Sequence, residues 1–320
     1  MMTDLRIPAH IVTGFLGSGK TTFLKTWLRE MKQEGKTPGV VMNEWGDLNI
    51  DREDFADEPL LEMLDGCICC TIQDDLKEDL SRFLNQTKER PDVLFIEATG
   101  IADPYEIVAA VSDIELIDRL KPESVIGVID AKHFLSYLSL FQSSKEVRTT
   151  LKHQIQASSL VVLNKIDLID EKTKEKVHKK IAAEKSVSVP VIEAEHGDIS
   201  FAQVLATQRQ SVNSDFPTTD ELQSEHHHDH DHSFHVVSID IDHKVSAAEI
   251  TKWIKQLPAE VIRMKGVVQL EDGSFTRIQW AGEKIEYKQT ELEKSRVILI
   301  GYHVSPELMR KSLLQGMNYS

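Results

Sequence analysis

An α/β fold with a mostly parallel sheet flanked by helices, followed by a small α+β domain, is predicted by three observations. Short apolar runs alternate with helical patterns over the first two thirds of the chain. Most of these runs are continuously apolar, as expected for strands buried on both faces of a sheet. After a polar stretch, strands predominate and two of them are joined by a hairpin signal. The pattern therefore predicts a first domain over residues 1–200, a polar His-rich linker over 201–233 and an α+β domain over 234–320.

In the first domain, the alternation predicts a strand before nearly every helix. The expected strands are His10–Thr13, Val40–Asn43, Val93–Glu97, Val125–Asp130, Leu160–Asn164 and Val189–Glu193. The expected helices are Thr21–Lys32, Ile72–Gln86, Pro104–Val111, Lys145–Ala157 and Glu171–Ala183.

The second domain has a different order of elements. Glu271-Asp-Gly-Ser274 is a hairpin signal between two strand patterns, and helical patterns flank the strands. The expected strands are Phe234–Ile241, Val261–Leu270, Phe275–Trp280 and Val297–Tyr302, and the expected helices are Ala247–Gln256 and Pro306–Gln315.

Composition and charge argue against two classes of partner. The formal net charge is −15, whereas nucleic-acid binding by counterion release needs a basic face. An anionic membrane would also repel this chain, and no apolar run approaches the ~18 residues of a membrane span. The first residues lack the basic-then-apolar order of a signal peptide. We therefore expect a cytoplasmic protein without nucleic-acid or membrane partners.

Residues 14–21 match the phosphate-loop pattern G-x-x-x-x-G-K-S/T at every fixed position, between a strand and a helix pattern. Backbone N–H groups and the helix N-terminus would bind the phosphates of a nucleotide. Lys20 is expected to reach the β- and γ-phosphates, and the Thr21 hydroxyl is expected to hold Mg²⁺. The predicted nucleotide-binding residues here are Gly14, Gly17, Ser18, Gly19, Lys20, Thr21 and Thr22.

Asn164-Lys165-Ile166-Asp167 follows an apolar strand pattern and indicates guanine recognition. A carboxylate at Asp167 can accept two hydrogen bonds, from N1–H and the exocyclic amine of guanine. Adenine has no such pair of donors at those positions, and a site built for paired hydrogen bonds rejects the analogue that lacks them. Asn164, Lys165 and Asp167 are therefore predicted to contact the nucleotide.

Two further segments are expected near the γ-phosphate. Glu97 ends the strand pattern that begins at Val93, and Gly100 follows three residues later. Glu97 would act on Mg²⁺ through water or orient the attacking water, and Gly100 would present its N–H to the γ-phosphate. Together with Lys20 they are the predicted catalytic residues. Residues 43–51 follow the second strand and are expected to respond to the γ-phosphate as a switch segment.

The three cysteines of the chain lie within four positions, at Cys67, Cys69 and Cys70. Clustered thiolates are soft ligands suited to Zn²⁺, and a carboxylate such as Glu44 would complete a tetrahedral site. Two alternatives remain open: cysteines that are small buried apolar side chains, and a redox role for the C-x-x-C spacing.

A second candidate for metal binding is the run His226-His-His-Asp-His-Asp-His232, which holds five histidines. Such tracts collect Zn²⁺, Ni²⁺ or Co²⁺ weakly, and the alternative is a solvated linker. The residues proposed to bind metal in this run are His226, His227, His228, His230 and His232.

Together these motifs resemble the CobW family of P-loop GTPases, which includes YjiA-type proteins and zinc-regulated GTPase metalloprotein activators. The shared segments are GFLGSGKTT at 14–22, NEWGDLNID at 43–51, GCICC at 66–70, EATGIADP at 97–104 and NKID at 164–167. The family usually has Phe where this chain has Trp45. The resemblance implies GTP hydrolysis with Mg²⁺, coupled to delivery of a metal ion to a client protein.

Three functional readings follow from these residues. The first is a GTPase metallochaperone that binds zinc at the cysteines and transfers it to a client metalloprotein. A second copy of this chain, in a homodimer, is a further expected partner. The second is a zinc storage or sensing protein with a vestigial GTPase. The third is a nickel or cobalt insertase, which would assist a metalloenzyme or cobalamin synthesis.

Overall fold

The computed structural model describes residues 4–42, 60–62, 72–87, 89–184, 189–213, 234–282, 284–302 and 304–317. Its chain forms two compact units. The first unit comprises Met1–Val111 and Arg119–Ser214, and the second comprises Ser112–Asp118 and Asp215–Ser320.

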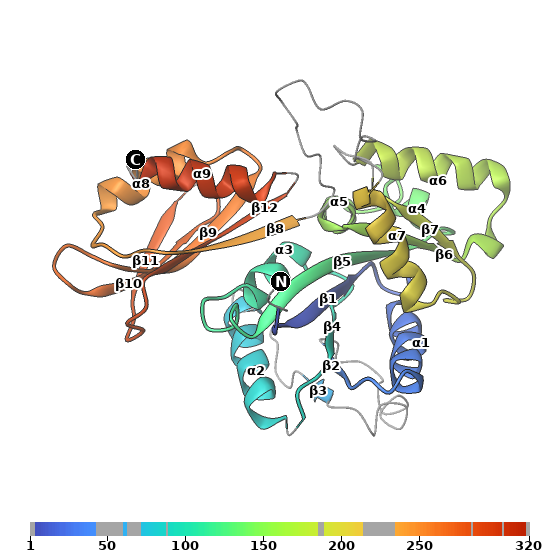
Figure 1. Ribbon diagram of the computed structural model, residues 1–320. Coiled ribbons are helices and arrows are strands. Elements are labelled where there is room, and N and C mark those ends of the chain that lie inside the picture. Colours follow the sequence, from blue (N-terminus) through green and yellow to red (C-terminus); the bar gives the residue numbers. More distant parts are fainter. Residues whose placement is uncertain are drawn as a thin grey trace, which may run out of the picture. The chain divides into compact units, whose positions relative to one another are not determined.

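The first unit is built on a seven-stranded sheet in which every described pair of neighbours is parallel. The strand order is β3-β2-β4-β1-β5-β6-β7, so β1 lies near the middle (Figure 1). This confirms the predicted parallel sheet and adds β3 to the expected strands. The bounds are β1 Ile7–Thr13, β2 Pro38–Met42, β3 Leu60–Glu62, β4 Val93–Glu97, β5 Leu120–Asp130, β6 Leu160–Asn164 and β7 Val191–Ala194.

Helices cover both faces of this sheet because its central strands are apolar on both sides. Helices α1 (Lys20–Gln33) and α7 (Phe201–Asn213) contribute to one hydrophobic cluster with the sheet. Other helices form a second layer, whose cluster includes side chains of α4, α5 and α6. These helices are α2 Ile72–Gln86, α3 Pro104–Val111, α4 Phe134–Tyr137, α5 Lys145–Ala157 and α6 Glu171–Glu184.

The parallel topology brings the carboxyl ends of four strands to one edge of the sheet. Val12 of β1 pairs with Glu97 of β4, and Asp130 of β5 pairs with Asn164 of β6. The loop that follows each strand therefore begins beside the phosphate loop. Ligands of open α/β sheets bind at this edge, beyond the carboxyl ends of the strands.

Residues 201–213 form helix α7, so the prediction of a polar linker is wrong for this part of 201–233. Phe201 and Val204 are buried against the sheet, and the N–H of Phe201 donates to Glu30 Oε2 of α1 at 2.8 Å. The sequence signal is weak because only one narrow stripe of α7 is apolar, between glutamines and threonine. Residues 214–233 lie outside the described residues.

The second unit holds a five-stranded antiparallel sheet in the order β11-β10-β9-β12-β8. Helices α8 and α9 pack on one face of it, around the buried Trp253 and Met309. The hairpin predicted between β9 and β10 is confirmed, and β11 is an additional strand. The bounds are β8 Phe234–Asp240, α8 Ala247–Gln256, β9 Val261–Gln269, β10 Phe275–Trp280, β11 Ile285–Gln289, β12 Arg296–Tyr302 and α9 Pro306–Gly316.

The segment 112–118 interrupts the first unit in sequence and packs within the second. Ile114 and Ile117 of this segment cluster with Val267 of β9 and Ile298 of β12. Alternate residues of a strand point to opposite faces, and Val297 and Leu299 join α8 and α9 on the other face. The segment 112–118 therefore covers part of the face opposite α8 and α9 within the second unit.

None of the helices in the described part of the chain combines the length and the apolar character that a membrane crossing requires.

Candidate nucleotide-binding site

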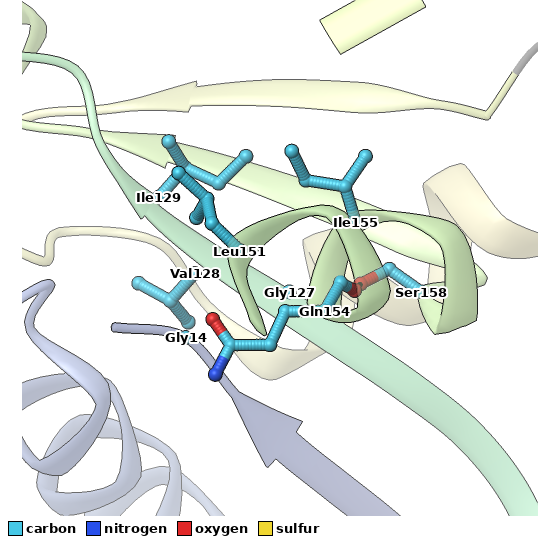
Figure 2. A pocket seen from close by; sticks show the side chains of 8 residues that line it. All are labelled: Gly14, Gly127, Val128, Ile129, Leu151, Gln154, Ile155 and Ser158. Atoms are coloured by element: carbon cyan, nitrogen blue, oxygen red, sulfur yellow. Dashed lines mark hydrogen bonds between the residues drawn. The ribbon is translucent and has the colours of Figure 1, made fainter. Parts of the chain in front are cut away.

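The phosphate loop connects β1 to α1, as the sequence predicts. Gly19 precedes the first turn of α1 with φ 105°, and a Cβ there would lie 2.5 Å from Nδ2 of Asn164. Only glycine fits this backbone and this close approach. Ser18 and Lys20 are buried, whereas Gly17 and Thr22 are exposed. A small cavity adjoins Gly14 at the start of the loop (Figure 2).

Lys20 is directed at its own loop. Its Nζ donates to the carbonyl oxygens of Gly14 at 2.9 Å and Phe15 at 3.4 Å. A lysine held at this loop is placed to contact the phosphates that such a loop binds. The predicted position of Lys20 at the phosphate loop is therefore seen in the structure.

Thr21 and Glu97 meet across two elements, from the first turn of α1 and the end of β4. Thr21 Oγ1 donates to Glu97 Oε1 at 2.8 Å, and Glu97 is buried. A hydroxyl oxygen and a carboxylate are hard ligands, and such ligands suit Mg²⁺. The pair of side chains that the sequence predicts for magnesium thus lies together and fits that ion.

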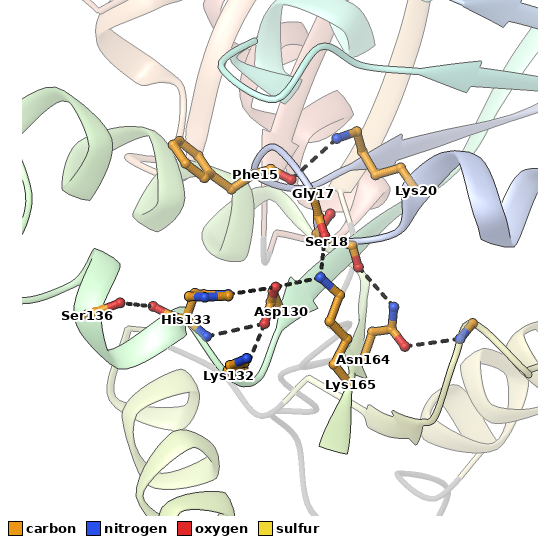
Figure 3. Close-up of polar contacts among 11 residues, drawn as sticks. Phe15, Gly17, Ser18, Lys20, Asp130, Lys132, His133, Ser136, Asn164 and Lys165 are labelled. Carbon is orange, nitrogen blue, oxygen red and sulfur yellow. Dashed lines mark hydrogen bonds and ion pairs between the residues drawn. The ribbon is translucent and has the colours of Figure 1, made fainter. Parts of the chain in front are cut away.

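Asn164 connects the end of β6 to two loops (Figure 3). Its Nδ2 donates to the carbonyl of Ser18 at 2.9 Å, and its Oδ1 accepts from the N–H of Gly197 at 3.2 Å. Because Asn164 is buried, these bonds replace contacts with water and fix the distance between the base motif and the phosphate loop.

Lys165 reaches from the same motif to the phosphate loop. Its Nζ donates to the carbonyl of Gly17 at 2.6 Å and to Asp130 Oδ2 at 2.7 Å (Figure 3). Burial alone would raise the pKa of Asp130, but hydrogen bonds from Lys165 and His133 and the charge of Lys165 outweigh it and lower that pKa. Asp130 is therefore an ionised partner that holds Lys165 in place.

Asp130 and His196 are two site residues that the sequence motifs did not identify. His196, in the loop after β7, has a left-handed backbone at φ 52° and places Nε2 3.7 Å from Asp167 Oδ2. Asp130 is the last residue of β5 and His196 follows β7, so both lie at carboxyl ends of strands, as the predicted residues do. The rule that ligands gather at this edge of the sheet is the signal by which they could have been found.

Gly100 lies against the phosphate loop, as predicted for a residue near the γ-phosphate. A Cβ at Gly100 would lie 2.6 Å from the side chain of Leu16 in that loop. The carbonyl of Gly100 accepts a hydrogen bond from Gln154 of α5 at 3.1 Å.

The residues predicted to bind zinc or another transition metal lie outside the described residues. These are Glu44, the three cysteines and the histidine run, with the switch segment 43–51. Elsewhere, within the part of the chain that the structure describes, no three His, Cys, Asp or Glu side chains converge as a metal site. Cys67, Cys69 and Cys70, and His226, His227, His228, His230 and His232, therefore remain sequence-based predictions.

These contacts give the site a definite chemical character. One end carries the phosphate loop, Lys20 and the Thr21–Glu97 pair, which suit a magnesium-bound phosphate chain. The other end carries Asn164, Lys165 and Asp167, which suit a purine base with paired donors.

Comparison with known proteins agrees with this geometry. Residues 8–193 match the model of the CobW/HypB/UreG nucleotide-binding domain, and residues 234–316 match that of the cobalamin synthesis protein cobW C-terminal domain. The "Zinc chaperone CobW" of Sinorhizobium sp is 28% identical over 98% of this chain and 97% of its own length. The "Zinc chaperone YjiA" of Escherichia coli K12 is 27% identical over 95% and 96%.

Among solved structures, a zinc-bound triple mutant of the YjiA GTPase covers 97% of this chain and 98% of its own, at 22% identity and a TM-score of 0.47. The family assignment rests on the domain models, of which the first spans residues 8–193 and holds every described residue of the phosphate and base motifs. The chain belongs to the CobW/HypB/UreG family of nucleotide-binding proteins.

Proposed function

We propose that this protein hydrolyses GTP and uses the nucleotide state to control the binding and transfer of a metal ion, zinc in the first instance, to a client metalloprotein. The observation that carries the nucleotide half is the contact between the two motifs. Asn164 donates to Ser18 and Lys165 donates to Gly17, so a guanine-type base motif is joined directly to a phosphate loop. We therefore expect a single nucleotide to span both motifs.

Each residue of the proposed site has a physical role. Lys20 and the N-terminus of α1 would stabilise negative charge on the phosphates. Thr21 and Glu97 would hold Mg²⁺, directly or through water, and the ion would neutralise charge on the phosphate oxygens when bound. Asp167 would accept the two donors of guanine, while Gly100 would offer its N–H to the γ-phosphate.

The proposed binding and transfer of a metal ion is supported by the sequence and by the names of similar proteins. Cys67, Cys69 and Cys70 lie in the chain between the predicted switch segment 43–51 and the Glu97–Gly100 segment. A site between two segments that respond to the γ-phosphate would change its shape when GTP is hydrolysed. Two full-length relatives carry the name zinc chaperone, which favours zinc as the cargo.

Turnover measurements test the two halves separately. We expect magnesium-dependent GTP hydrolysis by the purified protein, a change in turnover with Zn²⁺, and loss of that zinc response in the triple variant Cys67→Ser, Cys69→Ser, Cys70→Ser. Zinc affinity should differ between protein saturated with a non-hydrolysable GTP analogue and protein saturated with GDP. Equal zinc affinities would exclude the coupling, and absence of guanine-nucleotide binding would exclude the nucleotide half.

A second candidate function, zinc storage or sensing, is favoured by the five histidines between His226 and His232. Deletion of residues 226–232 separates the two. If tight stoichiometric zinc survives the deletion and is lost in Cys69→Ala, the metallochaperone is supported. If the deletion removes most of the bound zinc, storage is supported.

A further inference from the structure

Two side chains of helix α5 form hydrogen bonds to the segment that follows β4. Gln154 Nε2 donates to the carbonyl of Gly100 at 3.1 Å. Its neighbour His153 donates from Nδ1 to Asp103 Oδ2 at 3.2 Å. Two adjacent residues of one helix therefore hold both ends of the four-residue turn between Gly100 and Asp103.

The Gln154 contact is fully buried. Gln154 is 2% exposed, and its Oε1 has no hydrogen-bond partner among the described residues. The carboxamide points toward Gly14 of the phosphate loop, beside a cavity with room for about one water molecule (Figure 2). The hydrogen bond from Nε2 to the Gly100 carbonyl therefore sets the direction of this buried carboxamide.

Helix α5 is a rigid base for this contact. Leu151 and Ile155 on the same face are buried in the cluster with β5 and β6. Ser158 Oγ donates to the carbonyl of Gln154 at 2.5 Å at the end of the helix. The backbone of Gln154 is therefore held against the sheet by the packing of α5. Its side chain, through the hydrogen bond to the Gly100 carbonyl, holds Gly100 in turn.

Gly100 is confined on its other side by the phosphate loop. A Cβ at Gly100 would lie 2.7 Å from the backbone nitrogen of Leu16 as well as against the Leu16 side chain. Leu16 and Gln154 thus hold the Gly100 backbone from two directions. Beyond the turn, the N–H of Tyr105 donates to Asp103 Oδ1 at 3.0 Å, so Asp103 caps the N-terminus of α3.

We infer that Gln154 is a positioning residue: by holding the carbonyl of Gly100 it fixes the backbone of that glycine, and so the direction of the Gly100 N–H that would contact the γ-phosphate of GTP. His153 is a secondary support through Asp103. The inference rests on the proposed GTP site. Since Gly100 would contact only the γ-phosphate, a loss at Gln154 affects GTP and leaves GDP unchanged. A merely structural role would affect both nucleotides alike.

The test compares Gln154→Met with Gln156→Met in the full-length protein. Methionine has nearly the volume of glutamine but cannot donate, and it also removes the unsatisfied oxygen. Gln156 lies on the exposed side of α5, where its Nε2 donates to the carbonyl of Glu184 at 3.4 Å, so it is a matched control. The measurements are the dissociation constants of a non-hydrolysable GTP analogue and of GDP, each with Mg²⁺.

For Gln154→Met we expect the affinity for the GTP analogue to fall about five- to tenfold, as for loss of one hydrogen bond near a charged ligand, with GDP affinity unchanged. His153→Ala should give a smaller change of the same kind, and Gln156→Met should match wild type. Equal losses for both nucleotides, or no change in either, would overturn the role of Gln154 while leaving the GTP site intact. A wild-type protein that binds neither nucleotide would overturn the inference together with the proposed function.

Discussion

His10 shows how a single residue in the sheet sets the response of the fold to acid. It lies in the middle of β1, is 3% exposed, and has its Nδ1 2.6 Å from Ser124 Oγ. Burial, with a smaller contribution from the charge of Lys121, lowers the pKa of His10 to about 3. The neutral imidazole therefore predominates in the folded protein above that value.

Acid should therefore destabilise the first unit through His10. The unfolded chain binds a proton at the ordinary histidine pKa of about 6.5, and the folded chain does not until about pH 3. Stability from this group is complete above about pH 6.5 and is lost as the pH falls toward about 3. Between pH 6.5 and 4, the loss of unfolding free energy should be on the order of 3 kcal/mol smaller in His10→Gln than in wild type.

Denaturant unfolding at several pH values measures that difference. The exposed His178, whose Nε2 lies 2.8 Å from Glu193 Oε1, provides the control His178→Gln. A parallel pH dependence in wild type and His10→Gln would show that His10 is not the group responsible.

Asp130 acts at the same scale on nucleotide binding. It is ionised, with a lowered pKa, and it accepts from Lys165 Nζ at 2.7 Å and from the N–H of Lys132 at 2.9 Å. Its ion-pair stabilisation is present above the ordinary carboxyl pKa and is lost as the pH falls through the lowered value. Asp130 is thus connected to the predicted base motif through Lys165.

We expect Asp130→Asn to weaken GDP and the GTP analogue by the same factor, roughly three- to thirtyfold, because Lys165 belongs to the base end of the site. Asp242→Asn, at an exposed aspartate of the second unit, is the control. Equilibrium binding with both nucleotides checks this prediction. A loss confined to the GTP analogue would instead connect Asp130 to the γ-phosphate.

At the scale of elements, strongly patterned segments could be predicted from the sequence and weakly patterned ones could not. Strands β4 and β6 and helices α2, α3 and α5 have the predicted bounds because an apolar run or stripe ends at clear polar or proline signals. Strand β11 has one half-buried residue and four exposed ones, so it has no apolar period to detect. Its edge position explains this, since an edge strand pairs on one side only.

The candidate site follows the same division. Local motifs identified Lys20, Thr21 and Asn164, since each lies at a fixed spacing from its neighbours in the chain. Gln154 and Asp130 belong to the site through the packing of α5 and β5, which no local spacing records. A sequence motif does not reveal tertiary contacts between distant segments, even when the helix or strand that makes the contact is predicted correctly.

Helix α7 should contribute to the stability of the first unit although the sequence predicted a linker there. The ring of Phe201 lies 5.0 Å from that of Phe95 and 5.0 Å from that of His10, measured between centroids. We expect Phe201→Ala to lower the free energy of unfolding by about 3–5 kcal/mol, as for other buried phenylalanines.

The chain supplies a matched control for this substitution. Phe141 is 99% exposed, and Phe141→Ala should change the free energy of unfolding by less than about 0.5 kcal/mol. Denaturant unfolding of both variants decides the matter. Comparable small effects at the two positions would mean that α7 is not part of the cooperative fold.

At the scale of the whole molecule, residues 112–118 belong to the second unit although α3 precedes them and β5 follows them. Arg277 of β10 donates to Asp113 Oδ2 at 3.0 Å and to Glu115 Oε1 at 2.6 Å. Arg296 of β12 donates to Asp118 Oδ1 at 2.6 Å. The chain therefore crosses between the units at 111–112, 118–119 and 214–215.

The two ion pairs should differ in their importance. The side chain of Asp118 is 59% exposed, and exposed pairs contribute about 0–1 kcal/mol. The side chain of Asp113 is 8% exposed and that of Arg277 is 24% exposed. Burial alone would lower the pKa of Arg277, but the charges of Asp113 and Glu115 outweigh it and raise that pKa. Removal of Arg277 leaves the buried Asp113 carboxylate without its partner, which is the costly case.

We therefore expect Arg277→Met to reduce the stability of the second unit by roughly 1–3 kcal/mol, since the pair is only partly buried. Its effect should be visible where the segment 112–118 packs, because Ile114 and Ile117 are held against the sheet beside that pair. Amide hydrogen exchange should become faster in residues 112–118 of Arg277→Met, while Arg310→Met, at an exposed arginine of α9, should behave as wild type. If exchange in this segment were unchanged, the apolar contacts of Ile114 and Ile117 alone would hold the inserted segment on the antiparallel sheet, and the charge pair would be dispensable there.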